Sequence, residues 1–226
     1  MDLQIALMLG QDGMVNGAIY ALMALALVLV FSVTRVILIP QGEFVTYAAL
    51  SMAAIQAGKL PSIVWLLITL AVLVLIVETW RHSRGVRVDW KSTVVWAVVV
   101  PAMAAALVFG LKPQSGWLQA LVVFALITPM GPLVYRLVFR PLAHASVLFL
   151  LIVAVALHLV MVGLGLYYFG AEGSRTNAIW DASWDLGGVP VSGQSLVVVF
   201  TAIVLLIAMF WFFGRSIIGK ALRDGH

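Results

Sequence analysis

The sequence predicts an all-α, polytopic transmembrane helical bundle, and its composition is the first observation behind that prediction. Hydrophobic residues make up 64% of the 226 residues and charged residues only 10%, and the mean hydropathy is +1.13. A soluble chain typically has about 45–50% apolar and about 25% charged residues, so this chain has too few polar groups to cover a water-facing surface. The composition excludes a disordered region, a nucleic-acid module and, with zero cysteines, a disulfide scaffold.

The second observation is the length of the charge-free runs. A helix needs about 17–25 apolar residues to cross the hydrocarbon core. Six runs are long enough, and the second, with 14 residues, either crosses with its ends among the headgroups or enters and returns on one side. About seven membrane segments are therefore expected, in chain order at residues 13–33, 44–57, 60–77, 92–111, 113–135, 145–170 and 192–214.

The third observation is the distribution of basic residues, which orients the chain. The only charged residues before the first run are Asp2 and Asp12, whereas a cleavable signal peptide has basic residues there. The first run is therefore expected to remain in the mature protein as the first span. Seven crossings with an external N-terminus place ten of the 13 Lys and Arg in the cytoplasm, as the positive-inside rule requires. Without a crossing at 44–57, the best split is nine to four with the N-terminus inside. Both versions make residues 81–91 and the C-terminus cytoplasmic.

Motifs of catalytic sites are missing from the sequence. There is no Gly-x-x-x-x-Gly-Lys-Ser/Thr loop, no His-Glu-x-x-His helix and no Gly-x-Ser-x-Gly elbow, and the four histidines are scattered. Of the acids, only Glu43 and Glu78 lie beside apolar runs. We expect no catalytic residue, no metal ligand set and no cofactor, and hence no enzyme.

Polar and small residues mark the first span. Asn16 and Tyr20 lie four apart and share one face, which makes them candidates for a substrate pathway, although Asn16 would equally serve to cross-link helices. Gly13, Gly17 and Ala21 form a small-xxx-small series that lets another helix approach closely.

The segment after the first span is more informative. Pro40 is followed by Gln41, Gly42 and Glu43, which are further pathway candidates, and Glu43 stands where the next helix begins. A carboxylate there interacts favourably with the helix dipole, so a structural cap is as good an interpretation as a transport role. Residues 44–57 are rich in Ala, and a short helix entered through Pro-x-Gly is typical of the discontinuous helices of transporters.

Four further features each leave two interpretations open. The Thr-Pro-Met-Gly-Pro sequence at 128–132 is a kink or a hinge. His158, in the middle of the sixth run, bonds a neighbouring helix or relays protons. Trp180 and Trp184, in the external loop 171–191, anchor at the headgroup level or form a docking surface. The charge run 81–91 is by default an inside loop beside anionic lipid.

Three stretches of this sequence resemble the branched-chain amino acid permeases of ABC importers. Residues 12–44 match the family's opening helix, the Thr-Arg-Val-Ile turn and the His/Gln-Gly-Glu signature, here Gln41-Gly42-Glu43. Residues 139–145 (FRPLAHA) are similar to the family's Tyr-Arg-Pro-Leu segment. Residues 214–223 (GRSIIGKALR) resemble the start of its cytoplasmic coupling segment.

The resemblance implies an inner-membrane permease subunit of a bacterial ATP-driven importer for branched-chain or related hydrophobic amino acids. It implies ATP-binding subunits on the cytoplasmic side, a second permease subunit, a periplasmic solute-binding protein and surrounding membrane lipid as partners, and no nucleic acid. The candidates for ATPase coupling are Gly219, Lys220, Ala221, Leu222 and Arg223.

The chain departs from the family pattern in two ways. It has three spans where the family has one, which implies an added two-span hairpin near 60–111. Family members also continue past the coupling stretch, so residues 1–226 are expected to form a single permease domain that corresponds to the N-terminal portion of the family fold. The alternatives are a self-contained secondary transporter or channel, and an inactive truncated membrane fragment.

Overall fold

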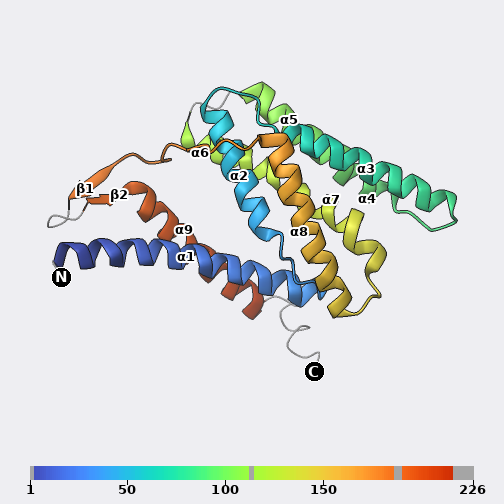
Figure 1. The fold of residues 1–226 in the computed structure, drawn as a ribbon, viewed down its shortest axis with the longest axis horizontal. Helices are drawn as coiled ribbons and strands as arrows, with labels where there is room; N and C mark the ends of the chain where they lie inside the picture. The colour runs from blue at the N-terminus through green and yellow to red at the C-terminus, as the bar shows by residue number, and fades with distance from the viewer. Residues whose placement is uncertain (1–2, 112–114, 186–189, 216–226) are drawn as a thin grey trace. The chain divides into compact units, whose positions relative to one another are not determined.

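The structure, a computed structural model, describes residues 3–111, 115–185 and 190–215 (Figure 1). Nearly all of the secondary structure in these residues is helical, which confirms the all-α prediction. Six helical segments among them are long and apolar enough to cross a membrane: Ile5–Thr34, Ile63–Ser83, Trp90–Gly110, Gly116–Leu142, Val147–Phe169 and Gly193–Trp211. They correspond to the six long runs of the sequence, and the short second run forms a helix of 16 residues.

The contacts within the chain group it into two compact units. The first unit comprises Met1–Leu38 and Ala178–His226, and the second comprises Ile39–Asn177. Each unit has its own packing and is described by itself. The expectation of one permease domain over the whole chain stays a prediction.

The first unit consists of two long helices and a hairpin. Helix α1 (Leu3–Thr34) packs against helix α9 (Gly193–Arg215), which crosses it at an angle (Figure 1). Strands β1 (Ser183–Asp185) and β2 (Pro190–Ser192) pair antiparallel, with Trp184 opposite Val191. The hairpin lies in what the sequence predicted only as an external loop, and within it the rings of Trp180 and Trp184 meet edge to face at 5.1 Å.

The second unit is a helical bundle. It begins with α2 (Gln41–Gln56) and α3 (Ile63–Ser83). One continuous span is built from α4 (Trp90–Val94), the π-helix η1 (Val95–Val99) and α5 (Val100–Leu111). The next joins α6 (Gly116–Ile127), α7 (Met130–Val134), the π-helix η2 (Tyr135–Phe139) and the short 3₁₀-helix η3 (Arg140–Leu142), and α8 (Val147–Phe169) follows.

The core of this unit is centred on α3, which packs against α5, α7 and α8. Its buried side chains recur at helical spacing, and they are almost all apolar: Ile63, Val64, Leu66, Leu67, Leu70, Ala71, Val74 and Glu78. Glu78 is the exception, and its burial requires charged partners from neighbouring helices.

Proline explains where the helices deviate. Each π-helix ends just before a residue that precedes proline, at Val100-Pro101 and Arg140-Pro141. In each case this residue donates its N–H to the carbonyl five residues back, Val95 and Tyr135 respectively. A proline ring clashes with the carbonyl four residues before it, and a wider turn relieves that clash. The break predicted at 128–132 is also present, because α6 ends at Ile127 and α7 begins at Met130.

Candidate functional site

The first polar site of the second unit is built on the first turn of α2. Pro40 is the N-cap residue, and Gln41, Gly42 and Glu43 form the start of the helix. Oε1 of Glu43 lies 2.7 Å from Nδ1 of His158, in the middle of α8. The two atoms are within ion-pair distance, although their orientation does not meet hydrogen-bond geometry. The carboxylate of Glu43 therefore interacts favourably with the dipole of α2 and also contacts a second helix, α8.

A second contact joins the same two helices one turn further along. The hydroxyl of Tyr47 donates to the backbone carbonyl of Met161, and its ring stacks on Phe169 with the centroids 5.3 Å apart. Tyr47 is only 1% exposed. Glu43 and Tyr47 are four residues apart, and His158 and Met161 are three apart, so each pair lies on one face of its helix. We call the Glu43–His158 and Tyr47–Met161 contacts together the α2–α8 latch.

An apolar cavity of about 380 Å³ lies beside this latch. Tyr47 and Met161, which form the second contact of the latch, also line the cavity. The rest of the wall is aliphatic and comes from α3, α7, η2 and α8: Leu66, Leu70, Leu73, Met130, Val134, Leu137, Val138, Val153, Ala156, Leu157, Val160 and Leu164. Such a cavity can accept a hydrocarbon group but offers nothing to bind a charge.

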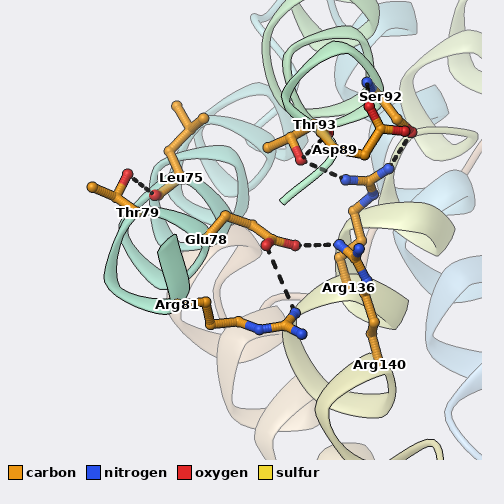
Figure 2. Close-up of polar contacts among 9 residues, drawn as sticks. All are labelled: Leu75, Glu78, Thr79, Arg81, Asp89, Ser92, Thr93, Arg136 and Arg140. Atoms are coloured by element: carbon orange, nitrogen blue, oxygen red, sulfur yellow. Dashed lines mark hydrogen bonds and ion pairs between the residues drawn. The ribbon is translucent and has the colours of Figure 1, made fainter. Parts of the chain in front are cut away.

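A second polar site surrounds Glu78, near the end of α3 (Figure 2). Its Oε1 lies 2.6 Å from Nη1 of Arg140, which donates to it, and its Oε2 lies 3.7 Å from Nη1 of Arg81. The side chain of Glu78 is 2% exposed, while those of Arg81 and Arg140 are 21% and 30% exposed. The buried carboxylate thus holds two guanidinium groups that still reach the surface.

Arg136 extends the same site toward α4, as Figure 2 shows. Its Nη1 donates to Oγ1 of Thr93 at 2.8 Å, and its Nη2 donates to Oγ of Ser92. Asp89, the N-cap of α4, accepts from the backbone N–H of Ser92 at 3.3 Å. These contacts fix the end of the Gly116–Leu142 span against the start of the Trp90–Gly110 span.

The sequence predictions named only some of these residues. Glu43 and His158 were singled out, but their pairing was not predicted, and Tyr47 was missed. Glu78 and Arg140 were noted separately, as an acid beside a run and as part of the FRPLAHA segment. The helical spacing of Glu43 with Tyr47 was the available signal, but nothing in the sequence shows which helix faces them.

The other candidate residues lie apart from these sites or outside the described chain. Asn16, Tyr20 and Ala21 are exposed on α1. A Cβ added at Gly13, Gly17 or Gly42 would meet no described atom within 4 Å other than those of the adjoining residues and of its own helix backbone. The proposed coupling residues, Gly219, Lys220, Ala221, Leu222 and Arg223, lie outside the described residues.

Clusters of metal-ligating side chains would be a further kind of candidate site. No group of three or more His, Cys, Asp or Glu side chains that could hold a metal ion occurs there. Glu43 and His158 alone would supply two ligands, too few for a structural site.

Comparison with models of protein families, with curated proteins and with solved structures found no match to this chain. The family resemblance therefore rests on the three sequence stretches described above.

Proposed function

We propose that the chain is a permease subunit of an ATP-driven importer for branched-chain or related hydrophobic amino acids. The observation that supports this best is the contact between Glu43 and His158. The Gln-Gly-Glu stretch that resembles the family signature opens a short helix, and its carboxylate contacts a full-length span. A residue that only capped α2 would need no such partner.

In this proposal the α2–α8 latch is the element that moves. ATP hydrolysis in a partner subunit tilts the helices, and α2 changes its position against α8 as access alternates between the two sides. The short length of α2 and its start after Pro40 fit such a role, because a discontinuous helix can change position while the neighbouring full-length span stays in place.

The chain itself supplies no energy in this scheme. The sequence has no nucleotide-binding loop, so ATP-binding subunits would dock on the cytoplasmic side, at residues 219–223. A periplasmic binding protein would deliver the substrate, and a second permease subunit would complete the pathway.

The test is ATP-dependent uptake of leucine into vesicles that contain this chain together with its ATPase and permease partners and its binding protein. Uptake is expected to require every component and to fall strongly with Glu43→Ala. A Lys220→Ala/Arg223→Ala variant should lose ATPase co-purification but still insert in the membrane. Uptake that persists without the ATPase would reject the proposal.

Secondary transport is the second candidate, and the Glu43–His158 contact is also the observation that favours it. A carboxylate and an imidazole that face each other on membrane helices are groups that can exchange protons during transport. The chain alone in vesicles would then take up solute in response to a proton gradient, and an uncoupler would abolish that uptake. An uncoupler has no direct effect on uptake driven by ATP.

A further inference from the structure

The cytoplasmic end of α3 carries a marked surplus of positive charge. Residues 78–91 and 136–140 contain six basic and two acidic side chains, a surplus of four, which equals the +4 formal charge of the whole chain. Arg81 and Arg140 are gathered at one point by the buried carboxylate of Glu78 (Figure 2).

These arginines keep hydrogen-bonding capacity. A guanidinium group has five N–H donors, and Arg140 uses Nη1 for Glu78. The 3.7 Å between Arg81 and Glu78 is too long for a hydrogen bond. Nη1 of Arg81 is buried beside Glu78, but both side chains are partly exposed, so their remaining donors are available to a planar or tetrahedral anion.

Tryptophans mark this region as the membrane–water interface. Trp80 and Trp90 are 57% and 37% exposed, and exposed tryptophans of membrane proteins lie at the headgroup level. The guanidinium carbon of Arg84 lies 4.6 Å from the centroid of the Trp80 ring, which holds a third cation at the same depth.

The apolar cavity is lined by the two spans that carry these arginines. Leu66, Leu70 and Leu73 line it from α3, and helical spacing continues their face into Arg81 and Arg84, since Leu66 and Arg84 are five full turns apart. Val138 of η2, in the same span as Arg140, also lines the cavity.

We propose that Arg81 and Arg140 bind the phosphate of an anionic phospholipid, and that one of its acyl chains occupies the apolar cavity. The charge surplus, the interfacial tryptophans and the wholly apolar cavity each match one part of such a molecule: its anionic headgroup, the depth of that headgroup and its hydrocarbon chain. The site goes beyond the proposed transport function and does not depend on it.

The experiment measures retention of phosphatidylglycerol and phosphatidylcholine of equal chain length by the purified full chain, using native mass spectrometry. The wild type should retain phosphatidylglycerol selectively. Arg81→Gln/Arg84→Gln, which leaves the Arg140–Glu78 pair intact, should weaken that retention about tenfold. Arg87→Gln/Lys91→Gln is the matched control, because it removes the same charge from the adjoining loop and the first turn of α4, and it should retain selectivity.

Two further arms separate this ligand from other anions. Leu73→Trp, at a partly exposed position of the cavity wall, should lower phosphatidylglycerol retention by obstructing the acyl chain. Glycerophosphoglycerol and inorganic phosphate, which lack acyl chains, should not displace the lipid at equal concentration. Equal retention of the two lipids, equal losses in both double variants, or displacement by inorganic phosphate would overturn the proposal and indicate unspecific charge or an acidic protein partner.

Discussion

Oε1 of Glu43 lies 2.7 Å from Nδ1 of His158, and this contact ties the first turn of α2 to the middle of α8. Tyr47 reinforces it one turn away, through its hydroxyl and the carbonyl of Met161. Polar contacts between helices carry weight in a bundle whose buried side chains are mostly apolar, because each such group is costly to leave unpaired in an apolar setting.

The Glu43–His158 contact should appear as an energetic coupling. We expect Glu43→Ala and His158→Ala each to lower the stability of the purified chain, and the double variant to lose about 1 kcal/mol less than the sum of the two. The measurement is a double-mutant cycle on thermal unfolding in detergent, with Glu172→Ala/His158→Ala as an uncoupled control cycle. Losses that add within about 0.5 kcal/mol would mean that the contact contributes no stability.

The Glu78–Arg140 pair should respond asymmetrically to truncation. Arg140→Ala leaves a carboxylate that is 2% exposed with only the more distant Arg81, and we expect a loss of about 3 kcal/mol. Glu78→Ala leaves partly exposed arginines that can turn toward water, so its loss should be smaller. The Glu78→Ala/Arg140→Ala variant should recover part of the loss. Equal losses in the two single variants would contradict this account of the buried charge.

The positions of the helices could be predicted from the sequence because the length of an apolar run is a local property. The six long runs appear as six candidate spans, and Pro129 breaks the fourth of these where predicted. The hairpin of β1 and β2 was not predicted, because strands of three residues carry too little pattern to recognise. The two π-helices were also missed, although both precede a proline.

The pairing of the site residues could not be predicted, because it depends on which helix faces which. Glu78 and Arg140 are 62 residues apart, and either could have met another charge. The sequence indicated Glu43 as the acid at the start of the second apolar run and His158 as a polar residue inside the sixth. A bundle of several helices, however, allows many pairings that satisfy the same periodicity, and only the packing of α2 on α8 selects this one.

Gly165 should be intolerant of a side chain, because Tyr47 packs against its backbone. A Cβ at this position would lie 3.0 Å from Cε1 of Tyr47, whose ring is held by Phe169 and by the Met161 carbonyl. We expect Gly165→Ala to lower stability by about 1 kcal/mol and to weaken the α2–α8 latch. Gly163→Ala, on the same helix with open space around it, should be neutral or slightly stabilising. Thermal unfolding of both variants would test this, and similar midpoints would contradict it.

The glycine face of α1 should serve contacts with another chain. Apart from the adjoining residues and the backbone of α1 itself, no described atom lies within 4 Å of a Cβ built at Gly13 or Gly17, so a Cβ there meets no other part of the described chain. Gly17→Leu should therefore leave the unfolding midpoint of the isolated chain nearly unchanged but reduce its co-purification with the proposed second permease subunit, because leucine keeps helices apart. Ala26→Leu is the matched control: Ala26 is exposed and lies two and a half turns from Gly17, on the opposite side of α1. If both leucines reduce co-purification equally, or if Gly17→Leu destabilises the isolated chain, the small-residue face has no specific role in assembly.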